Sequence, residues 1–140
     1  MSKVRIVYAT KTKHSKKIAM AMGKALNVPA QNIADHPSID ETDLLFVVGG
    51  IYGGKSLPEL LDFVGKLDGG KIKKTALVTS CTTKKKGQDE VRKLLEEKEI
   101  PVLDEFICYG SFLLLKAGHP NKTEIQEAVD FSVRLTQGLV

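Results

Sequence analysis

The stretch that decides the fold reads VRIVYA over residues 4–9, TKTKHS over residues 10–15 and KKIA over residues 16–19. The first segment is apolar apart from Arg5, which is typical of a strand covered on both faces. After the polar segment, Ile18, Met22 and Leu26 recur at helical spacing. The stretch therefore predicts a strand over residues 3–9, a loop rich in hydroxyl groups, and a helix over residues 14–27.

A loop of this kind directs backbone N–H groups and hydroxyls toward one point at the positive end of the helix dipole, which favours a bound phosphate. The alternative is a hydroxyl-rich helix cap with incidental lysines. The Walker pattern GxxxxGK[ST] and the dinucleotide pattern GxGxxG are both missing here, and the strand does not end in the acidic residues of a phospho-acceptor receiver domain. The candidate phosphate ligands are Thr10, Lys11, Thr12, Lys13, His14 and Ser15.

The length and composition indicate one globular domain over residues 1–140, with 42% hydrophobic and 27% charged residues. The sequence contains no apolar run long enough for a membrane span and no signal-type segment, so we expect a cytoplasmic protein without a membrane partner. Its two cysteines, Cys81 and Cys108, are far apart and lack CxxC spacing, which favours reduced thiols over a metal site.

The rest of the chain alternates strands with helices. Further strands are predicted at residues 30–34, 43–49, 74–81 and 101–109, and further helices at 87–98 and 121–137. Another helix is expected after Ser56, which has the spacing of a capping box with Glu59. This alternation predicts an α/β fold, a doubly wound five-stranded parallel sheet with strand order 2-1-3-4-5.

In such a sheet ligands bind beyond the carboxyl ends of the strands, so the loops at 10–15, 49–56, 80–87 and 109–119 should share one edge. Tyr52 lies among glycines and could place its ring against a planar ligand, although simple packing is the alternative. A phosphate at one end and an aromatic wall at the other describe a mononucleotide with a flat ring. The residues expected around that ring are Gly50, Ile51, Tyr52, Gly53, Gly54, Cys81, Thr82 and Thr83.

The formal net charge is +4, and lysines follow two of the predicted strands, at residues 11–17 and 84–86. Nucleic-acid binding is not favoured, because the lysines are not interleaved with aromatic residues and no nucleic-acid motif is present. A solvated face and an acidic protein partner both remain open for this basic rim.

Over nearly its whole length the sequence resembles the flavodoxin family. The family's phosphate loop has the form [ST]-x-T-G-x-[ST], and residues 10–15 read TKTKHS, with Lys13 in place of the glycine. The family's second loop, which flanks the flavin with an aromatic ring, is similar to GGIYGGK at residues 49–55, and GHPN at residues 118–121 is similar to the entry into the last helix.

The resemblance implies the cofactor FMN. It implies that Thr10, Thr12, His14 and Ser15 bind the phosphate, that Tyr52 stacks on the isoalloxazine, that Gly53 lies near N5, and that residues 81–83 pass the pyrimidine end. The implied function is an electron-transfer protein or a small flavin-dependent reductase component, with a reductase or acceptor protein as redox partner. The alternative is a flavodoxin-like accessory subunit that does not hold flavin, which Lys13 would favour.

Overall fold

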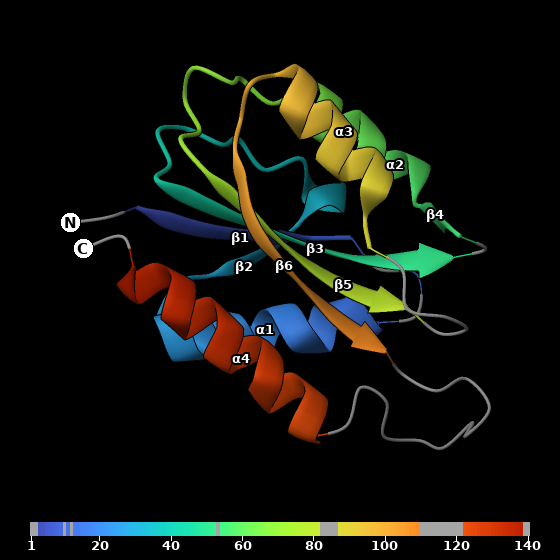
Figure 1. Ribbon diagram of the computed structural model, residues 1–140, viewed down its shortest axis with the longest axis vertical. Helices are drawn as coiled ribbons and strands as arrows, with labels where there is room; N and C mark the ends of the chain where they lie inside the picture. Colours follow the sequence, from blue (N-terminus) through green and yellow to red (C-terminus); the bar gives the residue numbers. More distant parts are fainter. Residues whose placement is uncertain are drawn as a thin grey trace.

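The computed structural model describes residues 3–9, 11, 13–52, 54–81, 87–109 and 122–138. Its strands are β1 (Val4–Tyr8), β2 (Ala30–Asn32), β3 (Leu44–Tyr52), β4 (Lys55–Ser56), β5 (Thr75–Cys81) and β6 (Val102–Tyr109). Its helices are α1 (His14–Leu26), the short 3₁₀ helix η1 (Ile33–Asp35), α2 (Pro58–Gly65), α3 (Asp89–Glu97) and α4 (Lys122–Gln137). These elements form a central sheet between two layers of helices (Figure 1).

The sheet has the order β2-β1-β3-β5-β6, and every pair along this path is parallel. The predicted five-stranded order is therefore confirmed, with β4 as an antiparallel addition at the end of β3. Tyr8 pairs with Val48, and Val48 pairs with Val78. The three central strands consequently end at the same edge of the sheet.

Alternate residues of the buried strands face two separate cores. Phe46 and Val48 of β3 pack with Ile18 and Met22 in the core beneath α1 and α4. Val47 lies in the opposite core, which includes residues of α2 and α3. This arrangement explains the nearly continuous apolar strands, because each strand has to fill both faces (Figure 1).

Two local predictions are wrong. The segment from Gly49 to Tyr52 is strand rather than loop, because β5 pairs with β3 as far as Ile51 and β4 pairs with its last two residues. The capping box at Ser56 does not form either. Leu57 caps α2 without a side-chain hydrogen bond, Pro58 occupies the first turn, and the Ser56 N–H donates to Glu90 Oε1 at 3.0 Å.

Other elements begin or end a few residues away from their predicted bounds. The predicted strand at 30–34 is only three residues long, since the chain turns into η1 at Ile33. The predicted start of the last helix at residue 121 lies outside the described residues, which resume at Lys122. Within the described ranges, no helix has both the length and the apolar character that crossing a membrane requires.

Candidate functional site

The predicted site residues that the structure describes lie at the edge where β1, β3 and β5 end. The structure describes Lys11, Lys13, His14, Ser15, Gly50, Ile51, Tyr52, Gly54 and Cys81. Five further candidates lie outside the described residues: Thr10, Thr12, Gly53, Thr82 and Thr83. The described part of the candidate site consists mainly of the start of α1 and the end of β3.

Lys13 immediately precedes α1 and has a left-handed backbone, with φ 70° and ψ 1°. This region is natural for glycine and costs a residue with a Cβ atom about 1–2 kcal/mol. Lys13 occupies the position at which the flavodoxin motif has glycine. The loop thus keeps the backbone form that suits a glycine, although the side chain is that of lysine.

Ser15 lies in the first turn of α1 and is 0% exposed. Its Oγ has no hydrogen-bond partner in the described part of the chain. A helix begins with N–H groups that have no partner within the helix, and the first turn of α1 carries no acidic side chain to meet them. A buried hydroxyl without a partner at a helix N-terminus is suited to an anion, because an anionic oxygen can accept from both kinds of donor.

The surface around this turn is basic. Lysine side chains that are exposed to solvent follow one another closely here: Lys11, Lys13, Lys16 and Lys17. They add positive charge to the positive end of the helix dipole. The electrostatics of the first turn therefore favour an anionic group.

Tyr52 connects the end of β3 with the loop after β1. The Lys11 backbone N–H donates to the Tyr52 hydroxyl at 3.2 Å, and Lys11 Nζ lies 5.8 Å from the centre of the ring. The ring lies close over Gly50, where an added Cβ would be only 2.6 Å from the Tyr52 hydroxyl oxygen. Lys11 and Tyr52, which belong to two segments expected at one edge of the sheet, are thus in direct contact.

Gly54 follows Tyr52 in the tight turn between β3 and β4, with φ 80°. Such an angle favours glycine, so this position supports the hairpin that carries Tyr52 at its end. Ile51 is 6% exposed, and its side chain is part of the packed interior. Of the described residues in this loop, Tyr52 is the one with a side chain suited to a flat ligand.

Both cysteines are buried near the same edge. Cys81 is 2% exposed, with its Sγ 3.8 Å from the Cys108 carbonyl oxygen. Cys108 Sγ donates to Glu124 Oε2 at 3.2 Å. Burial, and then the neighbouring Glu124, raise the pKa of the Cys108 thiol. Because both thiols are buried, they are poorly accessible to reagents. No group of metal-ligating side chains is found among the described residues.

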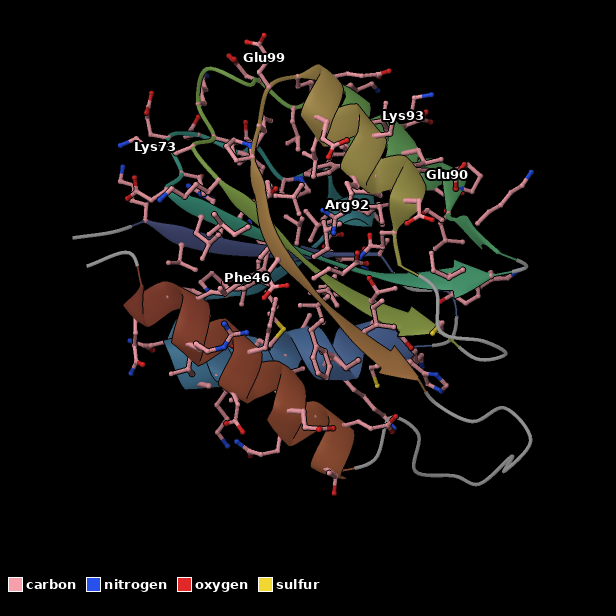
Figure 2. The ribbon with its side chains drawn as sticks, viewed as in Figure 1. Phe46, Lys73, Glu90, Arg92, Lys93 and Glu99 are labelled. Carbon is pink, nitrogen blue, oxygen red and sulfur yellow. The ribbon has the colours of Figure 1, made fainter. Side chains whose placement is uncertain are left out.

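A polar network below the edge was not predicted from the sequence. The Glu105 carboxylate accepts hydrogen bonds from the Thr79 hydroxyl, from the Gln88 backbone N–H at 2.8 Å, and from Arg92 at 3.0 Å. Gln88 is fully buried, and its amide donates to the carbonyl oxygens of Val47 and Val78. Arg92 points from α3 toward β6 (Figure 2). The network joins the start of α3 to the sheet.

The sequence offered one signal for this network. Glu105 is an acidic residue within an otherwise largely apolar strand, and a carboxylate at such a position needs partners. Its partners, however, come from two other segments of the chain, the end of β5 and the start of α3. Only the tertiary structure shows that they converge.

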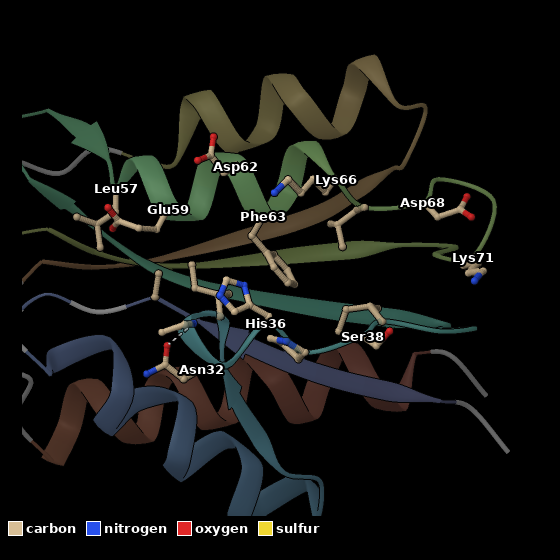
Figure 3. A pocket seen from close by; sticks show the side chains of 16 residues that line it. Asn32, His36, Ser38, Leu57, Glu59, Asp62, Phe63, Lys66, Asp68 and Lys71 are labelled. Atoms are coloured by element: carbon tan, nitrogen blue, oxygen red, sulfur yellow. Dashed lines mark hydrogen bonds between the residues drawn. The ribbon is translucent and has the colours of Figure 1, made fainter.

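A separate pocket of about 710 Å³ lies between α2 and the β2–β3 connection (Figure 3). Phe63 reaches into it from α2, on the side facing the segment that carries His36. His36 caps the C-terminal end of η1 with φ 50°. The pocket comes near the candidate site only at Ala9 and Leu57, so it is distinct from the first turn of α1.

Comparison with known families and structures supports the same fold. A family model described as "Flavodoxin domain" matches residues 5–129. The comparison with curated proteins gives no match.

Several solved structures are similar in fold. Rubredoxin oxygen:oxidoreductase from Desulfovibrio gigas has a TM-score of 0.73 at 12% identity, and the match covers 99% of this chain but only 36% of that one. A flavodoxin from the domain Archaea has a TM-score of 0.64 at 13% identity, with 97% of both chains covered. A short-chain flavodoxin associated with a bacterial microcompartment has a TM-score of 0.62 at 17% identity, with 100% of both chains covered.

Proposed function

Because the chain belongs to the flavodoxin domain family, we propose that it binds FMN at the edge formed by the start of α1 and the end of β3, and that it transfers electrons. When bound, FMN supplies the redox chemistry, while the protein binds and orients it. The observation that carries the proposal is Ser15, whose fully buried hydroxyl has no hydrogen-bond partner among the described residues and lies at the N-terminus of a helix surrounded by lysines. These donors suit the phosphate of FMN.

Each part of this edge has a distinct role in the proposal. The first turn of α1 and Ser15 hold the phosphate, and the left-handed backbone at Lys13 gives the loop its curvature. Tyr52, at the end of β3, supplies an aromatic face for the isoalloxazine. Cys81 lies at the end of β5, beside Thr82 and Thr83, for which we retain a position near the pyrimidine end.

The basic rim supports a proposal about the partner. The exposed lysines around the start of α1, Lys11, Lys13, Lys16 and Lys17, would attract a redox protein with an acidic docking face. Attraction between exposed charges is screened by salt, with a Debye length of about 10 Å at 0.1 M. Electron transfer to such a partner should therefore slow as ionic strength rises, whereas a rate independent of salt would contradict this docking mode.

An absorption spectrum tests the cofactor. The protein is purified gently, incubated with FMN, and passed through a desalting column to remove the excess. Visible flavin bands that remain with the protein at close to one FMN per chain are the expected result. Complete loss of the bands on the column, together with no binding in an equilibrium titration, would contradict the proposal.

The second candidate is a flavodoxin-like accessory subunit that does not hold flavin. Lys13 is the observation that favours it, since a lysine with φ 70° strains the loop at the point of phosphate contact. Replacement by glycine distinguishes the two functions. A chain that binds FMN only as Lys13→Gly is an accessory subunit in its natural form, and a chain that binds FMN with lysine present is a flavoprotein.

A further inference from the structure

Tyr52 makes two contacts with Lys11, which lies in the loop that follows β1. Its hydroxyl accepts from the Lys11 backbone N–H at 3.2 Å, and Lys11 Nζ lies over its ring at 5.8 Å. Lys11 belongs to the loop for which we propose phosphate binding. The backbone N–H and the ammonium group of Lys11 thus already interact with the side chain of Tyr52.

The position of the ring depends on Gly50. A Cβ atom there would lie 2.6 Å from the hydroxyl oxygen and 2.8 Å from Cζ of Tyr52. No real Cβ atom tolerates such distances, so any other residue at position 50 would force the ring to move. The absence of a side chain on Gly50 makes the room in which Tyr52 folds back toward Lys11.

We propose that Tyr52 is a specificity-determining residue, whose hydroxyl takes the place of a phosphate oxygen on the Lys11 N–H until a phosphate displaces it. This inference rests on the proposed function and deepens it. A charged oxygen accepts a hydrogen bond more strongly than a neutral phenol oxygen, and a phosphate dianion attracts an ammonium group more strongly than the face of a ring does. A phosphate can therefore replace both contacts at once.

The exchange has a consequence for the choice of ligand. A flavin that carries a phosphate releases Tyr52, and the released ring becomes available to the isoalloxazine. Riboflavin has no anionic group to compete for the Lys11 N–H, so it meets a ring that is still held over Gly50. Tyr52 thus makes the phosphate a requirement for ring binding as well as a source of affinity.

Titration with inorganic phosphate, followed by the backbone amide NMR signals of the full chain, tests this inference. In Tyr52→Phe the competitor hydroxyl is absent, and we expect the phosphate dissociation constant to fall about three- to tenfold, as the loss of one competing hydrogen bond implies. Gly50→Ala keeps the hydroxyl but displaces the ring, and it should shift the constant in the same direction. Tyr8→Phe, which removes a hydroxyl from a buried tyrosine of β1, serves as the matched control and should leave it within twofold.

Two results would overturn the inference. Weaker phosphate binding by Tyr52→Phe would show that the hydroxyl is a ligand of the phosphate, and unchanged binding in both variants would show that it does not compete. The amide spectra also report whether each variant is folded. Failure of the proposed function would be a separate result. In that case phosphate would still displace Tyr52, but the protein would bind no FMN.

Discussion

Lys13 shows how a single residue can conflict with the backbone that the fold requires. Its φ of 70° lies where glycine is at ease, and α1 must begin at the next residue. We predict that Lys13→Gly raises the free energy of unfolding by about 1 kcal/mol, because the Cβ atom that opposes this angle is removed. Urea unfolding of the two proteins under the same conditions measures the difference.

Asn27 provides a matched control for this change. It ends α1 with φ 58°, and asparagine tolerates the left-handed region better than lysine does. Asn27→Gly should therefore give a smaller gain than Lys13→Gly. A loss of stability in Lys13→Gly would show that the lysine side chain makes a contribution that outweighs its backbone strain.

Ser15 is the residue for which stability and ligand binding should separate most clearly. Its buried Oγ has no partner in the described structure, so Ser15→Ala should leave the free energy of unfolding within about 0.5 kcal/mol. Loss of a hydrogen bond to a charged phosphate should weaken FMN binding by about tenfold or more. Fluorescence titration with FMN and urea unfolding of the same variant test both parts.

Ser132 is the control for Ser15, because its buried hydroxyl has a hydrogen-bond partner within its own helix. It is also fully buried in a helix, and its hydroxyl donates to the Val129 carbonyl oxygen at 2.7 Å. Ser132→Ala should therefore keep the FMN affinity of the natural chain. If Ser15→Ala binds FMN as tightly as Ser132→Ala does, the hydroxyl of Ser15 is not a phosphate ligand.

At the scale of elements, Glu105 holds α3 to the sheet. Its side chain is 9% exposed and pairs with Arg92, while also accepting from Thr79 and Gln88. We predict that Glu105→Leu lowers the free energy of unfolding by about 2–3 kcal/mol, because three donors then lose their acceptor. The exposed Glu97 on α3 is the control, and Glu97→Leu should change stability by under about 0.5 kcal/mol. Equal effects of the two substitutions in urea unfolding would contradict this role.

Asp43 fastens the start of β1 to the start of β3. It accepts from the Lys3 backbone N–H at 2.7 Å and pairs with Lys73 at 3.2 Å. These contacts, the hydrogen bond from Lys3 first, lower the pKa of the Asp43 carboxyl. A lowered pKa in the folded state means that the stabilisation is present above the unfolded value of about 3.9 and is lost as the pH falls through the folded value.

The corresponding prediction concerns the pH dependence of unfolding. Between about pH 5 and pH 3 the natural chain should lose more stability than Asp43→Asn, which carries no titrating group at this position. Denaturant unfolding at a series of pH values compares the two slopes. Parallel curves over this range would mean that Asp43 does not contribute to acid sensitivity.

At the scale of the whole molecule, the sheet could be predicted because each buried strand is apolar on both faces and alternates with an amphipathic helix. Leu44 to Val48 show this most plainly, since every side chain among them is buried. The order of strands then followed from right-handed crossovers and the small number of strands.

The parts that escaped prediction depend on contacts between distant segments. β3 continues through Tyr52 because it pairs with β4 and β5. The glycine-rich sequence alone argues against a strand at this position. The candidate site, too, could be predicted only in part. The hydroxyl-rich loop and Tyr52 could be singled out from the sequence, and Lys13 could be recognised as a departure from the glycine of the flavodoxin motif. Only the tertiary structure could show the contact between Tyr52 and Lys11, and that Ser15 Oγ has no partner within the described ranges.

The most direct test of the central proposal is an equilibrium titration of the same protein with FMN and, separately, with riboflavin, followed by quenching of flavin fluorescence. The two ligands share the isoalloxazine and the ribityl chain and differ in the phosphate. Our account predicts that FMN binds at one site per chain and at least tenfold more tightly than riboflavin, because the start of α1 holds the phosphate. Equal affinities, or no binding of FMN, would contradict it.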